Sequence, residues 1–187
     1  MSGWKISLVL LLAVVVSGCA NRPRHNLADI PAAYSGPYRL DSGDQVRVTV
    51  FGQTDLTRVY PIDVSGNITM PLIGSVQARG GTPSQLSAAI AGRLAQNYVR
   101  NPDVSVEVQT YRPFFVLGEV QRAGQFPYVS GMTVQTAIAI AGGYTYRANQ
   151  EGVTITRQGR TELIRGLAPN DAPVMPGDTI YVDERLF

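Results

Sequence analysis

The fold is decided by a turn-and-strand pattern that occurs twice, first as Gly43-Asp44-Gln45-Val46-Arg47-Val48 and again as Gly177-Asp178-Thr179-Ile180-Tyr181-Val182. In each copy a glycine and an aspartate precede residues that alternate between the two faces of a strand, which is the period of a β-strand with one buried face. Aspartate favours turns because its carboxylate accepts hydrogen bonds from nearby backbone N–H groups. We therefore expect Asp44 and Asp178 to be hydrogen-bonding turn residues rather than catalytic acids.

The strongest helix signal lies in the middle of the chain, at Thr82-Pro83-Ser84-Gln85. Thr82 can cap the helix, proline suits the first helical position, and Gln85 completes a capping box. The apolar residues that follow are spaced to form one stripe: Leu86, Ala89, Ile90 and Leu94. We expect this helix to end near Val99, because Asn101-Pro102 interrupts it.

A second, shorter helix is predicted from Val134, with Thr133 as its cap. Its apolar residues repeat with helical spacing, and Ile138 lies in the centre of that stripe. Gly142-Gly143 follows, which is typical of a helix that ends at a glycine. Each predicted helix therefore comes after strand signals, and the chain is expected to contain two related strand–helix units.

Strand signals occupy most of the remaining sequence. We expect a hairpin with arms at 58–64 and 67–71, a hairpin with arms at 153–157 and 161–165, and strands at 46–50, 104–108, 114–120, 125–129 and 179–182. The near-continuous apolar run at 114–120 predicts a strand that is buried on both faces. The predicted class is α+β with two small mixed-sheet units. A Rossmann-like fold is not expected, because the sequence shows no long series of parallel strand–helix repeats.

The first residues indicate where the protein goes. Lys5 precedes an apolar run of nine residues, Leu8–Val16, which is shorter than the ~20 residues of a membrane span and fits a signal peptide. Val16-Ser17-Gly18-Cys19 resembles a bacterial lipobox, and the alternative is an ordinary secretory signal. The resemblance implies a signal peptide at 1–18 and acylation of Cys19. Residues 19–37 read as a tether, and Ala20 after the cysteine implies the outer membrane.

Composition argues against several functional classes. The net charge is +2, so no basic surface for nucleic acid is expected. Cys19 is the only cysteine and His25 is the only histidine, and His25 lies in the tether. Neither phosphate-binding pattern, GxxxxGK[ST] or GxGxxG, occurs. We therefore expect no cofactor and no metal site, and a protein that is not an enzyme.

The order of motifs resembles that of a known family. The segments Tyr38–Val50 and Asp63–Gly74 resemble a polysaccharide biosynthesis/export domain, which gives a predicted domain at 38–111. The segments Val116–Val120 and Gly131–Gly143 resemble a soluble-ligand-binding β-grasp (SLBB) domain, which gives a second domain at 112–187. Behind a lipobox, this order is similar to that of the outer-membrane polysaccharide export lipoproteins.

The resemblance implies a lipid-anchored periplasmic component of capsule or exopolysaccharide export. It implies a homo-oligomeric ring that guides the polymer, an inner-membrane copolymerase partner and a separate outer-membrane pore. The expected location is the periplasmic face of the outer membrane, because only five residues follow the last predicted strand, too few for a membrane helix. The alternative is a periplasmic lipoprotein that binds or regulates glycans and forms no conduit.

Three residues after the second predicted helix are candidates for sugar contact. The rings of Tyr144 and Tyr146 can stack on sugars, and Arg147 can meet an acidic group. The alternative is that these residues pack at a subunit or domain interface.

Overall fold

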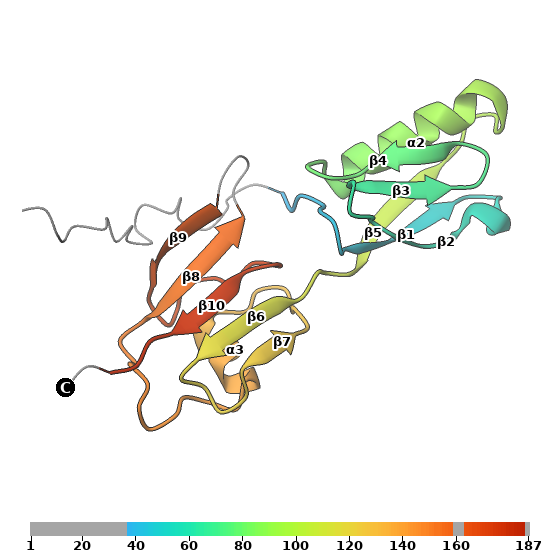
Figure 1. Cartoon of the computed structure of the whole chain (residues 1–187). Coiled ribbons are helices and arrows are strands. Elements are labelled where there is room, and N and C mark those ends of the chain that lie inside the picture. The colour runs from blue at the N-terminus through green and yellow to red at the C-terminus, as the bar shows by residue number, and fades with distance from the viewer. Residues whose placement is uncertain (1–36, 159–162, 186–187) are drawn as a thin grey trace, which may run out of the picture.

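The computed structural model describes residues 37–158 and 163–185. The described elements form two successive units, and each has its own cluster of buried apolar side chains. Figure 1 shows the two units joined by the short segment between β5 and β6. The predicted signal peptide, Cys19 and most of the predicted tether lie outside the described residues.

The first unit contains a three-stranded sheet, a two-stranded sheet and one long helix. Its elements are β1 (Gln45–Val50), η1 (Thr54–Leu56), β2 (Arg58–Pro61), β3 (Asn67–Met70), β4 (Gly74–Gln77), α2 (Pro83–Asn97) and β5 (Val104–Thr110). The larger sheet has the order β2-β1-β5, and β3 pairs with β4. All of these strand pairs are antiparallel.

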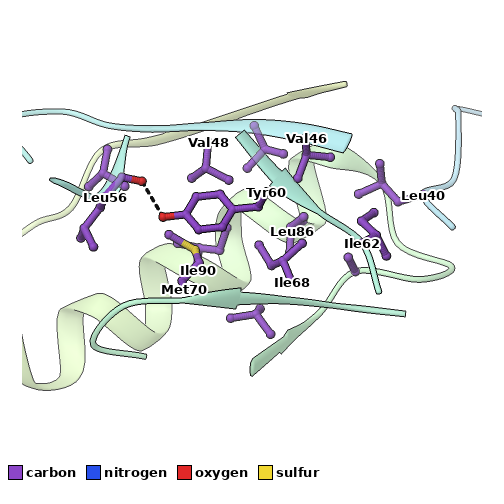
Figure 2. Packing of buried hydrophobic residues seen from close by; sticks show 14 of the residues in the cluster. Leu40, Val46, Val48, Leu56, Tyr60, Ile62, Ile68, Met70, Leu86 and Ile90 are labelled. Atoms are coloured by element: carbon purple, nitrogen blue, oxygen red, sulfur yellow. Dashed lines mark hydrogen bonds between the residues drawn. The ribbon is translucent and has the colours of Figure 1, made fainter. Parts of the chain in front are cut away.

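The core of the first unit lies between its strands and α2. Leu86, Ile90 and Leu94 of α2 are buried as predicted, whereas Ala89 is exposed at the edge of the stripe. The Tyr60 ring is buried in the same cluster, and its hydroxyl donates a hydrogen bond of 2.9 Å to the Leu56 carbonyl. Figure 2 shows this hydroxyl directed at the backbone of η1. The buried tyrosine is thus satisfied without water.

The predicted capping box of α2 is confirmed. The Thr82 hydroxyl accepts a hydrogen bond from the Gln85 backbone N–H at 3.2 Å, and the Gln85 side chain accepts one from the Thr82 N–H at 2.9 Å. The helix ends at Asn97, two residues before the predicted end, and Tyr98 is its C-cap. Two of the four N–H groups that a helix start leaves unpaired are therefore satisfied locally.

The second unit is a five-stranded mixed sheet with one helix. Its elements are β6 (Phe114–Gly118), β7 (Gly124–Phe126), α3 (Val134–Ile140), β8 (Val153–Gln158), β9 (Leu163–Ala168) and β10 (Thr179–Val182). The strand order is β7-β6-β10-β8-β9, and β10 runs parallel to β6 and antiparallel to β8. Val134, Ala137 and Ile138 of α3 are buried in one cluster with the inward residues of the strands. This α+β arrangement agrees with the predicted class. The sheet of the second unit is mixed, whereas the sheets of the first unit are purely antiparallel.

Two strand predictions are wrong. The expected hairpin between 58–64 and 67–71 does not form, because β2 pairs with β1 and β3 pairs with β4. The strand at 114–118 is buried on one face only, since Phe115 is 39% and Leu117 is 42% exposed. Apolar residues on both faces of β6 had suggested a covered strand, but the second unit places a helix on one side of its sheet.

Among the described residues, no helix has both the length and the apolar content that crossing a membrane requires.

Candidate functional site

The segment that carries the predicted sugar-contacting residues leaves α3 through two glycines. Gly142 has φ +86° and Gly143 has φ +91°, in the left-handed region that favours glycine. The Gly143 N–H donates to the Ile138 carbonyl at 2.9 Å, which closes the end of the helix. Tyr144 then forms an antiparallel bridge with Val120, so the segment is tied to the sheet directly after the helix ends.

Tyr144 has a structural partner. Its ring packs against the core of the second unit, and its hydroxyl donates a hydrogen bond of 2.8 Å to the Asn170 side-chain oxygen. Burial raises the pKa of the Tyr144 hydroxyl, so the group stays protonated and acts as a donor. Tyr144 therefore contributes to the packing of the second unit's own core.

Tyr146 and Arg147 lie on the surface. Tyr146 is 89% exposed. Arg147 is paired with Glu184, to which its Nε donates at 2.8 Å, and this hydrogen bond raises the pKa of the guanidinium. Of the three predicted contact residues, Tyr146 alone presents most of its ring to solvent. A ring in this position can stack on a sugar face.

The first buried carboxylate belongs to Asp44, which is 0% exposed. Its Oδ2 accepts hydrogen bonds from the Tyr38 hydroxyl at 2.7 Å and the Asp41 N–H at 2.9 Å. Its Oδ1 accepts from the Arg112 backbone N–H at 2.9 Å, and the Arg112 guanidinium lies 3.4 Å from Oδ2. Burial and the hydrogen bond to Asp44 raise the pKa of Tyr38, which keeps that hydroxyl a donor.

The second buried carboxylate, Asp178, is bound by a planar fork. Arg157 donates from Nε to Oδ1 at 2.9 Å and from Nη2 to Oδ2 at 2.7 Å. The Met175 backbone N–H also donates to Oδ2 at 2.7 Å, across the turn. The prediction that both aspartates are hydrogen-bonding turn residues is confirmed. Sequence reasoning did not find their arginine partners, because nothing in the local patterns shows which distant arginine reaches a turn.

The polar groups at these turns are used for folding. The oxygens of both carboxylates accept hydrogen bonds from the backbone or from neighbouring side chains. In the described part of the chain, no cluster of three or more histidine, cysteine, aspartate or glutamate residues is arranged to hold a metal ion.

Within the part of the chain that the structure describes, partly exposed apolar side chains gather on the face of the second sheet that points away from α3. Leu117, Tyr181, Thr154 and Leu167 are cross-strand neighbours in one row over β6, β10, β8 and β9. Leu117, Tyr181 and Leu167 are each 40–42% exposed. The row spans three inter-strand spacings of ~4.8 Å, or about 14 Å. Sequence reasoning missed this face, because the near-continuous apolar run of β6 had predicted a strand buried on both faces.

Two family models match the chain in succession. Residues 32–109 match the family described as polysaccharide biosynthesis/export protein, and residues 113–176 match the SLBB domain. Together they cover the first unit and the second unit up to residue 176, before β10.

Curated relatives share this region. The exopolysaccharide production protein ExoF of Rhizobium meliloti (strain 1021) is 32% identical over 148 residues, which are 73% of this chain and 32% of ExoF. The polysialic acid transport protein KpsD of Escherichia coli is 27% identical over 112 residues, which are 59% of this chain and 20% of KpsD. The chain thus spans about a third or less of the length of these relatives. The chain belongs to the polysaccharide export family and carries an SLBB domain behind its polysaccharide biosynthesis/export domain.

Proposed function

We propose that this protein is a lipid-anchored periplasmic component of a polysaccharide export system. The observation that carries the proposal is the succession of the two matched domains, together with the similarity to relatives named for exopolysaccharide production and polysialic acid transport. The proposal assigns the export domain to residues 38–111 and the ligand-binding β-grasp domain to residues 112–187.

The protein acts without chemical catalysis in this proposal. The buried Asp44 and Asp178 support it, because their oxygens are occupied by turn N–H groups, Tyr38 and two arginines. A general acid or base must instead reach the proton that it transfers. The relatives are named for production and transport of polysaccharide, which also fits a role in handling a finished polymer.

The proposed working form is a homo-oligomeric ring that guides the polymer toward the outer membrane. The uncovered row at Leu117, Tyr181 and Leu167 supports assembly, because exposed apolar surface of this kind marks interaction sites. A ring needs one interface that joins two different patches and closes. The proposed partners are the polysaccharide, an inner-membrane copolymerase and a separate outer-membrane pore, and no nucleic acid.

The proposed anchor is an acylated Cys19 that holds the protein at the periplasmic face of the outer membrane. Several acyl chains, at about 0.8 kcal/mol per buried methylene, make such binding essentially permanent. Cys19→Ser should leave the chain unacylated and move it out of the outer-membrane fraction. A Cys19→Ser protein that still fractionates with the outer membrane and supports normal export would contradict the anchor.

A second function is favoured by one observation, the 89% exposure of the Tyr146 ring. A periplasmic lipoprotein that binds or regulates glycans through Tyr146, without a conduit, would use such a ring. The mass of the detergent-extracted complex separates the two functions. A closed homo-oligomer with co-purifying export components supports the conduit, and a monomer that binds glycan and loses binding in Tyr146→Ala supports the alternative.

A further inference from the structure

The connection between the two units is only three residues long, Tyr111 to Pro113, and its side chains contact both units. Arg112 is bound to the first unit through its backbone N–H, which donates to Asp44, and through Nη1, which donates to the Tyr38 hydroxyl at 2.9 Å. Its side chain is only 21% exposed. Arg112, which follows the last strand of the first unit, is therefore fixed to the Gly43-Asp44 turn of that unit.

The same guanidinium lies against the Gly-Asp turn of the second unit. A Cβ placed on Gly177 would lie 2.7 Å from the Arg112 Nε, closer than real Cβ atoms approach another heavy atom. On the other side, a Cβ on Gly43 would lie 3.4 Å from the Arg112 Cβ. Arg112 thus lies between the glycines of the two turns, and neither glycine presents a side chain to it.

Three tyrosine rings form a second set of contacts between the two units. Tyr111 packs edge-to-face on Tyr38 of the first unit, with ring centroids 4.9 Å apart, and on Tyr128 of the second unit, with centroids 5.4 Å apart. Such edge-to-face pairs are attractive and have a preferred geometry. Pro113 restricts the backbone further, because it fixes its own φ and narrows the conformations of Arg112.

We infer that Tyr111 and Arg112 form a clamp that fixes the orientation of the second unit relative to the first. Because the two cores are separate clusters, this orientation is not set by a shared hydrophobic core. Short connections without such contacts leave domains free to move relative to one another. The clamp makes Tyr111 and Arg112 positioning residues for any assembly that requires both units at once, and this inference does not depend on which polymer or partner the assembly serves.

The clamp is tested by measuring the distance between spin labels on the two units. Labels at Gln96 and Glu151, both exposed, are introduced as cysteines into the complete chain carrying Cys19→Ser. We expect a narrow distance distribution for the parent chain and, because the ensemble of orientations widens, one roughly twofold broader or more for Arg112→Ala. Hydrogen exchange in α2 and β8 checks that both units stay folded.

Two further variants keep the test decisive. Arg93→Ala is the matched control, because Arg93 donates to the Ser75 carbonyl within the first unit and should leave the width unchanged. Arg79 does not serve as a control, because it binds Asp41, which also pairs with Arg112. Tyr128→Leu removes the ring that Tyr111 contacts and leaves every hydrogen bond of Asp44 in place, so it decides the matter if Arg112→Ala unfolds the first unit. The clamp is overturned if a folded Arg112→Ala and Tyr128→Leu both keep the parent width, or if Arg93→Ala broadens it equally.

Discussion

The two Gly-Asp turns begin their strands in the same way, but the arginines that balance their buried aspartates come from different places. Asp178 is held by Arg157 of β8, inside the same unit, through two hydrogen bonds of 2.9 and 2.7 Å. Asp44 is held by the Asp41 N–H of its turn, by the Tyr38 hydroxyl and by the backbone N–H of Arg112, and that arginine comes from the connection to the other unit. The same local motif thus forms contacts within the second unit at Asp178, whereas at Asp44 it binds the segment that connects the two units.

The difference concerns how much each aspartate depends on its arginine. Asp178 receives two of its three hydrogen bonds from the Arg157 guanidinium, whereas Asp44 keeps three donors when the Arg112 side chain is removed. Charge-assisted fork contacts are stronger than a single ion pair at 3.4 Å. The second unit should therefore be the more sensitive of the two to loss of its arginine.

The largest effect is expected from Arg157→Ala. It leaves Asp178 buried without its cation, and breaking a buried pair in this way costs about 3–5 kcal/mol. Hydrogen exchange across β8 and β10 should show the loss in the second unit. Arg112→Ala should destabilise the first unit less. Equal losses in the two units would show that both aspartates depend on their arginines to the same extent.

Asp44→Asn is expected to destabilise the first unit by about 1–3 kcal/mol. Both carboxylate oxygens accept hydrogen bonds, so either orientation of the asparagine amide places an NH₂ group against an N–H donor. Denaturant unfolding followed in α2 measures the effect. Asp63→Asn at an exposed turn is the comparison variant. A normal stability together with lost export would instead point to a chemical role for Asp44.

Substituting the two turn glycines should distinguish the effect of backbone strain from the effect of displacing the Arg112 side chain. Gly43→Ala and Gly177→Ala both place a side chain at positive φ, +90° and +84°, which costs about 1–2 kcal/mol. Gly177→Ala also displaces the Arg112 guanidinium, and Gly43→Ala meets only an ordinary contact. The label distance between the units should therefore broaden in Gly177→Ala and stay narrow in Gly43→Ala. A distance distribution that broadens in Gly43→Ala and stays narrow in Gly177→Ala would show that the contact between Gly177 and Arg112 does not help to fix the orientation.

The smallest effect is a pH dependence carried by Tyr38. Burial and Asp44 raise the pKa of Tyr38 in the folded protein, whereas the unfolded chain deprotonates near pH 10. Above about pH 10 the unfolded state binds fewer protons, so stability is present below that pH and falls as the pH rises. Tyr38→Phe should lower stability by about 1 kcal/mol at neutral pH and flatten the alkaline decline. Tyr146→Phe, at an exposed site, should leave the decline unchanged.

Local sequence signals predicted most helices, strands and turns. They could not predict which strands pair or which distant side chains meet, because these depend on long-range contacts. The helix caps, helix ends and Gly-Asp turns depend on neighbours within a few residues, so Thr82, Thr133 and Asp44 could be assigned from the sequence. The partner of β2 is β1 rather than β3, and this choice depends on how α2 and the sheets share one core. Arg112 and Arg157 lie 68 and 21 residues from their aspartates, which local patterns cannot reveal.

The candidate site shows the same contrast between features that depend on local sequence and features that depend on long-range contacts. The exposed ring of Tyr146 could be proposed from its place after a helix stop, but the pairing of Arg147 with Glu184 and of Tyr144 with Asn170 joins distant segments. The uncovered row at Leu117, Tyr181 and Leu167 depends on the strand order β6-β10-β8-β9, which no single segment specifies.

The proposed export function is tested most directly by the amount of surface and secreted polysaccharide in a strain that lacks this protein. The proposal predicts that the polymer is lost from the surface and returns when the wild-type chain is supplied. Ile138→Asp, which places an unpaired charge in the α3 core and should remove the folded protein, should fail to restore it. A strain without the protein that still exports a normal amount of every surface polysaccharide would contradict the proposed function.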